Sequence, residues 1–180
     1  MIGVKIRKIA MLILFAILLM ILSSCGGDDI VPAKDVVNGT VAAFPEFFGD
    51  PAVFSSKTEA GRDGHITEGE IYALYFGDKW DIKNCGELEF VDDWCAAFAK
   101  SNEVRELHVF HAKSRSHVTA IMRMAEFRAR TLSSPELFAA KSEFFGARPS
   151  DVRVFSVGKY VVLCAGGDCS ALENHLRGEL

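Results

Sequence analysis

The sequence predicts an α+β fold: a single antiparallel sheet of about four strands, arranged as two hairpins, with helices packed mainly on one face. Two pairs of strand-like segments support this, namely 88–98 with 104–112 and 152–157 with 160–165. Short connections between consecutive strands favour antiparallel pairing. A long amphipathic segment at 114–132 separates the two pairs and predicts a helix that packs against the sheet.

Two helices are expected ahead of the first strand pair. An apolar series at near-helical spacing predicts the first of them, at Val36, Val37, Val41, Phe44, Phe47 and Phe48. Pro45 cuts or kinks this helix. Residues 49–64 form a loop-rich stretch, and a capping box of Thr67 and Glu70 then opens a short helix that runs to Tyr75.

The second strand and the helix that follows it have the clearest patterns. Leu107 and Val109 alternate with Glu106 and His108, which is the period of a half-buried strand. The helix carries one apolar stripe, made of Val118, Ile121, Met122, Ala125, Ala129 and Leu132.

The last third of the chain alternates helix, hairpin and helix. Ser134 is placed as an N-cap and Pro135 as the first helical residue of another helix. The Gly-Lys pair at 158–159 is a compact two-residue turn between two β-branched runs. A final short helix from Ser170 follows Asp168.

The first 25 residues have the layout of a secretory signal. Lys5, Arg7 and Lys8 precede an uninterrupted apolar run over 9–22, and small residues then lead to Cys25. The arrangement resembles the lipobox of bacterial lipoproteins, in which the cysteine is lipidated and becomes the new first residue. A transmembrane anchor and an ordinary signal peptide are the alternatives, but the run is shorter than the roughly 20 apolar residues of a spanning helix.

We therefore expect a cleaved signal peptide and signal helix over 1–24, a lipid-anchored tether over 25–34 and one globular domain over 35–180. The predicted location is the extracytoplasmic face of a bacterial cell membrane, with the membrane as a partner through lipid (diacylglyceryl or palmitate chains) on Cys25. Two or more acyl chains give stable anchoring.

The charge of the chain is uneven. Residues 26–112 hold seventeen acidic and seven basic side chains, whereas residues 113–180 hold ten basic and seven acidic ones. Loss of the signal removes three positive charges, so the mature protein is more acidic than the net charge of −4 of the whole chain. An acidic protein without a basic run is a poor candidate for binding nucleic acid.

Four cysteines remain after the anchor, and outside the cytoplasm they can pair in three ways. They are Cys85, Cys95, Cys164 and Cys169. Cys95 and Cys164 lie in strand-like runs and also fit buried thiols. Between Cys164 and Cys169 a local disulfide is the main alternative to a simple strand end and helix N-cap.

The stretch 59–70 has some features of an EF-hand calcium loop. Glu59, Asp63 and Glu70 fall at the first, fifth and twelfth positions, but the third position is Gly61, which offers no side chain. A turn and the capping box explain the same residues, so these three are weak metal candidates, and no cofactor is expected.

No catalytic constellation is evident in the sequence. His108 and His111 are three apart on a strand, so they point to opposite faces and cannot chelate one ion together. An enzyme would have to assemble its site from scattered residues, for example His111, His117 and Asp168.

The helix over 114–132 carries a second strip that combines apolar and arginine side chains. Packing against the next helix explains it, and the alternative is an exposed interface for a partner protein of the cell envelope. The candidate interface residues are Arg123, Met124, Phe127, Arg128 and Arg130.

Two segments resemble a known family. The runs Val-Arg-Glu-Leu-His-Val-Phe-His-Ala-Lys at 104–113 and Val-Phe-Ser-Val-Gly-Lys-Tyr-Val-Val-Leu at 154–163, with the lipobox, are similar to the lipoproteins of Gram-positive anaerobes grouped as domain of unknown function 4358. The resemblance covers about residues 66–178. It implies a secreted, anchored α+β domain and supplies no activity, cofactor or functional residues. The four later cysteines are not a feature of that family.

These observations favour a membrane-anchored lipoprotein that acts as a non-catalytic binding or interaction module. The alternatives are an envelope enzyme and a domain stabilised by calcium through the 59–70 loop. A deep pocket that holds several perturbed polar groups would favour the enzyme.

Overall fold

The computed structural model describes residues 30–77, 86–141 and 146–180. The predicted signal segment with Cys25, and also Cys85, lie outside the described residues. Residues 32–180 form one compact unit. No helix among the described residues is both long and apolar enough to cross a membrane.

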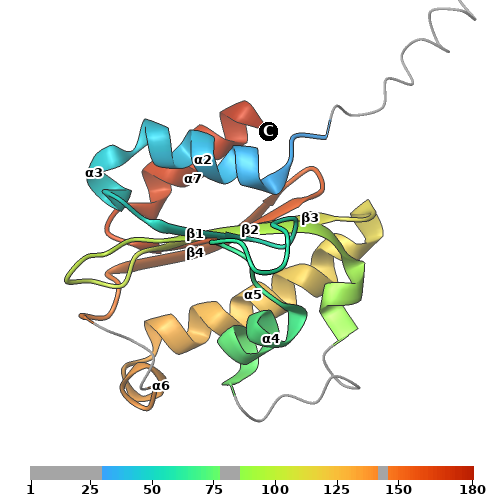
Figure 1. The fold of residues 1–180 in the computed structure, drawn as a ribbon. Helices are drawn as coiled ribbons and strands as arrows, with labels where there is room; N and C mark the ends of the chain where they lie inside the picture. Colours follow the sequence, from blue (N-terminus) through green and yellow to red (C-terminus); the bar gives the residue numbers. More distant parts are fainter. Residues whose placement is uncertain (1–29, 78–85, 142–145) are drawn as a thin grey trace, which may run out of the picture. The chain divides into compact units, whose positions relative to one another are not determined.

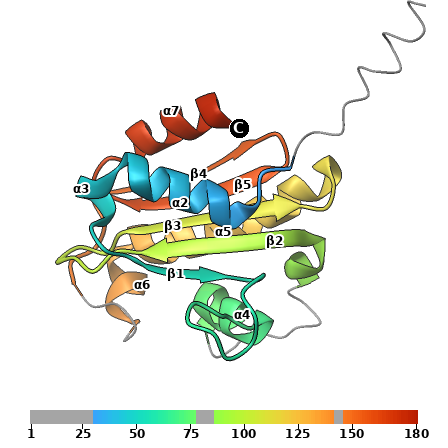
Figure 2. The same cartoon turned by 45° about the horizontal axis from the view of Figure 1, so that its top comes forward.

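The unit is built on one antiparallel sheet, which confirms the α+β class. The strands are β1 (Ala52–Ser55), β2 (Val91–Phe98), β3 (Glu106–Ala112), β4 (Asp151–Val157) and β5 (Tyr160–Gly166). Their order across the sheet is β1-β2-β3-β5-β4 (Figure 2). Both predicted hairpins are present, and the central contact is between β3 and β5.

The predicted number of about four strands is corrected to five. The extra strand, β1, lies in the stretch that the sequence marks as loop-rich, and it pairs with β2. It has only four residues, which is too short for an alternating pattern to stand out. Strand β2 begins at Val91 rather than near residue 88, because Gly86–Phe90 forms a 3₁₀ helix.

The expectation that helices cover mainly one face is wrong, because both faces are covered (Figure 1). On one face lie α2 (Ala33–Ala43), α3 (Pro45–Phe48) and α7 (Cys169–Glu179). On the other lie α4 (Glu68–Phe76) and α5 (Val118–Ser133), with α6 (Pro135–Ala139) beside α5. Every residue of β3 and β5 is buried, and a strand buried on both sides needs a helical layer on each.

Alternation along β3 sends its side chains into two separate cores. Leu107 and Val109 pack under α2 and α7, whereas Phe110 and Ala112 pack under α4 and α5. The prediction of a half-buried strand is therefore corrected. The polar positions that suggested a solvent-exposed side are themselves enclosed.

Several predicted helix ends are confirmed. The capping box of Thr67 and Glu70 opens α4, and the Ser134 hydroxyl accepts from the backbone N–H of Leu137 at the start of α6. The first turn of α2 has an unusual partner. Its Ala33 N–H donates to the Asp93 carboxylate of β2 at 2.8 Å, although Ala33 falls within the predicted tether.

Candidate functional site

A buried polar cluster lies between the sheet and the helices α4 and α5. Glu106 and His108 come from β3, Tyr75 from α4 and Arg128 from α5. All four side chains are almost completely enclosed. The rings of Tyr75, Trp94 and Phe98 surround His108, so the cluster lies in an apolar shell.

Arg128 and Glu106 form the centre of this cluster through a two-pronged ion pair. The Arg128 Nη2 atom is 2.7 Å from Glu106 Oε1, and its Nε atom is 3.2 Å from Oε2. The Nη1 atom donates to the carbonyl oxygen of Leu74 at 2.8 Å. Such bidentate pairs satisfy both carboxylate oxygens and fix the orientation of the guanidinium group.

His108 connects the ion pair to Tyr75. Its Nε2 atom lies 3.1 Å from Glu106 Oε2, and its Nδ1 atom lies 2.7 Å from the Tyr75 hydroxyl. A carboxylate can only accept, so Nε2 carries the hydrogen and Nδ1 accepts from the hydroxyl. A continuous series of hydrogen bonds therefore runs from the Tyr75 hydroxyl through His108 and the Glu106 carboxylate to Arg128.

The cluster holds one protonation state at neutral pH. Burial raises the pKa of Glu106, but the Arg128 charge and the His108 hydrogen bond outweigh it and lower the pKa to about 2. Burial lowers the pKa of His108 and raises that of Tyr75 well above its usual value. General acid–base catalysis works best when a pKa lies near the working pH, and these pKa values are shifted away from neutrality.

A cavity of about 360 Å³ opens beside the β2–β3 turn and reaches this ion pair. Glu106 and Arg128 line it together with apolar side chains of Leu74, Phe98 and Val104. The turn supplies further lining residues of both charges, which are Lys100, Glu103 and Arg105. We call this space the hairpin cavity.

Arg105 lines both the hairpin cavity and a second cavity of about 390 Å³. Its Nη1 atom donates to the carbonyl oxygens of Glu46 and Phe47, and its guanidinium lies over the Phe47 ring. Phe44, Phe47 and Leu172 give the second cavity a largely apolar lining. Phe47 also covers Gly166, where any side chain would overlap the ring and where φ is +153°.

The structure does not assemble the weak metal candidates into a site. Glu59 lies 3.9 Å from Arg62 on the surface, and Glu70 accepts from the backbone and hydroxyl of Thr67 in the capping box. Those Thr67 hydrogen bonds lower the pKa of Glu70. In the described part of the chain, no group of three or more His, Cys, Asp or Glu side chains could hold a metal ion.

The scattered catalytic candidates also lie apart. His111 packs on Tyr160 in the core under α2 and α7, with Nδ1 3.6 Å from the Asp92 carboxylate. His117 stacks on Phe90, which belongs to the opposite core. Asp168 caps α7 at the far end of β5, so these three residues do not form one site.

Two of the four later cysteines are joined in the structure. Cys164 and Cys169 form a disulfide, with their Cα atoms 5.8 Å apart, and so link the end of β5 to the start of α7. Cys95 is a buried free thiol, and burial raises its pKa to about 12. Both findings fit the alternatives that the sequence left open.

The predicted interface on α5 is divided between core and surface. Met124 and Arg128 are buried, so they are corrected to interior residues. Arg123 and Arg130 remain exposed, and Phe127 is 40% exposed although it contacts Phe76.

Sequence reasoning missed the buried cluster, yet a signal for it was present. Arg128 falls at the same helical spacing as Ile121, Ala125 and Leu132, all of which face the sheet. A charged residue on the apolar side of a helix needs a buried partner, and Glu106 on a buried strand is such a partner.

Comparisons with models of protein families, with curated proteins and with solved structures found no match to this chain.

Proposed function

We propose that this chain is a lipid-anchored, extracytoplasmic binding module that holds a small dipolar ligand in the hairpin cavity. The observation that carries the proposal is the cavity itself, whose lining combines apolar side chains with a fixed, buried ion pair. Ligand sites typically have this composition and volumes of 300–1,000 Å³. The resemblance to the family of domain of unknown function 4358 agrees with an anchored domain and remains a prediction.

The direction of the pKa shifts favours binding over catalysis. A pocket with perturbed polar groups is also what an enzyme would contain. Here, however, the perturbations keep Glu106 ionised and keep His108 and Tyr75 neutral around pH 7. Of these three groups Glu106 lines the cavity, and a group held in one protonation state orients a ligand by charge and hydrogen bonding without exchanging protons with it.

The mixed charge of the lining indicates the class of ligand. Lys100 at the exposed rim attracts a carboxylate, and the Glu103 carboxylate, 3.7 Å from Arg105, attracts an ammonium group. Glu106 and Arg128 are already paired with each other and present a fixed dipole on the wall. A ligand with only one charge would also lie near a group of the same charge on the cavity wall and would be repelled by it. A small zwitterion with an apolar side chain addresses both charges and the apolar surface.

Calorimetric titration with leucine, N-acetyl-leucine and leucine methyl ester tests this proposal. We expect leucine to bind at least ten-fold more tightly than either analogue that lacks one charge. Lys100→Glu, at the exposed rim, should weaken leucine binding, whereas the matched Lys57→Glu at the opposite end of the sheet should not. Absence of binding by all three compounds would contradict the proposed ligand class.

The anchor is tested separately with the full chain. Cys25→Ser should abolish labelling by radioactive palmitate and leave the precursor uncleaved. Labelling that survives the substitution would show that lipid is not attached at Cys25.

A further inference from the structure

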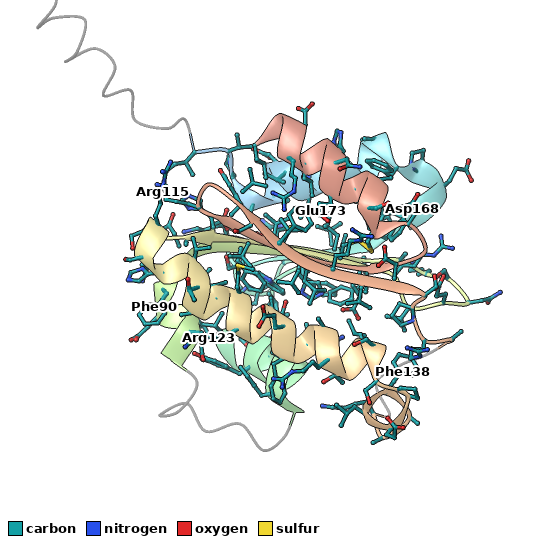
Figure 3. The ribbon with its side chains drawn as sticks, turned by 180° about the vertical axis from the view of Figure 1, so that it is seen from behind. Phe90, Arg115, Arg123, Phe138, Asp168 and Glu173 are labelled. Atoms are coloured by element: carbon teal, nitrogen blue, oxygen red, sulfur yellow. A yellow bond between two sulfur atoms is a disulfide. The ribbon has the colours of Figure 1, made fainter. Side chains whose placement is uncertain are left out.

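The sheet has an open edge at β4. Among the described residues, β5 is the only strand that pairs with β4. Figure 3 looks onto this edge, where the strand runs between α7 and α5. At seven residues it is almost twice as long as β1 at the other edge. Long unpaired edges offer a template for another strand.

Backbone geometry shows which residues of β4 offer free hydrogen-bonding groups. The turn at Gly158 has two residues, so Val157 and Tyr160 form a hydrogen-bonded pair. Alternation then directs the N–H and C=O groups of Val152 and Val154 away from β5. Neither residue has another hydrogen-bond partner in the part of the chain that the structure describes.

The same two valines line a groove of about 690 Å³ between β4 and α5. Both side chains are half-buried, and Ala129 of α5 adds to the apolar lining. The remaining lining residues belong to α5 and are polar or charged, namely Arg123, Glu126, Arg130 and Ser133. We call this feature the β4–α5 groove. In it, the free backbone groups of Val152 and Val154 lie beside a shallow apolar surface.

The charge of the groove is positive. Arg123 and Arg130 are seven residues apart, which puts them on one side of α5 and about 10 Å from each other. Within the described residues, no carboxylate lies within ion-pair distance of either arginine. Of the described residues that line the groove, Glu126 alone is acidic. The Arg130 guanidinium lies over the Phe127 ring, 5.3 Å from its centroid. Two arginines without an ion-pair partner among the described residues, against one carboxylate, favour an acidic occupant.

We propose that the β4–α5 groove binds an extended, acidic segment of a partner protein, which adds to the sheet as a strand alongside β4. Main-chain hydrogen bonds to Val152 and Val154 supply affinity, and acidic side chains that reach Arg123 and Arg130 supply selectivity. This site is separate from the hairpin cavity and does not depend on a ligand there.

A second copy of the chain fits this edge less well. If two β4 strands paired about a two-fold axis, both copies of α5 would lie on the same face of the joined sheet. Arg123 and Arg130 of one copy would then approach the same arginines of the other, and like charges would repel. An acidic segment meets no such opposition.

Fluorescence anisotropy with two labelled nine-residue peptides tests the proposal. One peptide alternates glutamate and valine, and the other alternates lysine and valine. We expect the glutamate peptide to bind at least ten-fold more tightly, and its affinity to fall with added salt. The double variant R123E/R130E should lose at least ten-fold in affinity for this peptide, whereas R62E, at an exposed arginine outside the groove, should change it less than two-fold.

A second measurement tests strand addition itself. Two versions of the glutamate peptide are used, one N-methylated at the odd-numbered residues and one at the even-numbered residues. Each version lacks the amide donors along one edge of the extended peptide. At least one version should lose binding, and full binding by both would overturn the proposal.

Three other results would also overturn it. The first is equal binding of the two peptides. The second is a concentration-dependent dimer, seen by sedimentation, that R123E/R130E abolishes. The third is absence of peptide binding together with co-sedimentation of the protein on phosphatidylglycerol vesicles that depends on the two arginines. The second would assign the edge to another copy of the chain, and the third would assign the arginines to a lipid surface. R123Q/R130Q repeats each measurement with smaller changes in charge if the reversal variant does not fold.

Discussion

The two faces of the sheet are stabilised by different means. Under α2 and α7 the core is mainly apolar, although it also encloses His111 and the Asp93 carboxylate that accepts from Ala33, and a disulfide links β5 to α7. Under α4 and α5 the core is larger but encloses an ion pair, a histidine and a tyrosine. Among the described residues, a buried ion pair between side chains lies only on the second face, so the two faces should respond differently to substitution and to pH.

The largest effect is expected from Arg128→Ala, because it leaves the Glu106 carboxylate buried without a partner. Loss of one member of a buried ion pair typically costs about 4 kcal/mol of unfolding free energy. Urea denaturation measures this loss. The double variant Glu106→Leu/Arg128→Met should recover most of the stability, and a loss below about 1 kcal/mol for Arg128→Ala would show that the pair is not essential.

Leu172→Ala on the opposite face should cost about 3 kcal/mol, since Leu172 is only 1% exposed and its removal leaves a cavity. The two faces should differ in whether a change at a partner residue rescues stability, as Glu106→Leu/Arg128→Met is expected to do for the ion pair. No partner replacement should restore Leu172→Ala, because no charge is left unpaired. Urea denaturation at pH 7 compares the two variants directly.

Replacement of Cys164 and Cys169 by alanine should lower the unfolding free energy by about 2 kcal/mol, the loop-closure value for so short a loop. Thermal denaturation with and without a reducing agent provides the measurement. If the unaltered protein loses no stability on reduction, the disulfide contributes nothing to this face.

The largest part of the pH dependence of stability should come from the face that contains the cluster. The pKa of Glu106 is about 2 in the folded protein and near 4.5 when unfolded, so the unfolded chain binds more protons between these values. Stability should therefore fall as the pH drops through this window, by up to about 1.4 kcal/mol per pH unit. His108 acts in the same direction below pH 6.5, because burial lowers its pKa.

Glu106→Gln provides the control for this prediction. It removes the acidic titration while keeping the shape of the side chain, so the slope between pH 4.5 and 2 should flatten. An unchanged slope in urea denaturation at each pH would assign the acid sensitivity to other carboxylates.

Local patterns predicted most of the secondary structure. The capping box, the Ser134–Pro135 helix start and the two-residue turn at 158–159 depend on residues close in sequence, and all are confirmed. The helix α5 also follows its predicted stripe. Each of these features requires only a few neighbouring residues to specify it.

The missed features depend on contacts between distant residues. β1 exists because β2 offers it a partner, and the Glu106–Arg128 pair joins residues 22 apart. Coverage of both faces follows from burial along the whole of β3 and β5. The alternating pattern of β3 suggested instead that one side of the strand is exposed to solvent. The hairpin cavity likewise forms where α4, α5 and the β2–β3 turn meet, and no single segment encodes it.

The pairing of β3 with β5 has a consequence for how the chain folds. Each hairpin closes over a short loop, but the centre of the sheet joins residues 106–112 to residues 160–166. Contacts so far apart in sequence form slowly. Until α5 and α6 are in place, both apolar strands present an unpaired edge, and partly folded intermediates with such edges tend to aggregate. We therefore expect the joining of the two hairpins to limit the folding rate and to be the step most sensitive to protein concentration during refolding.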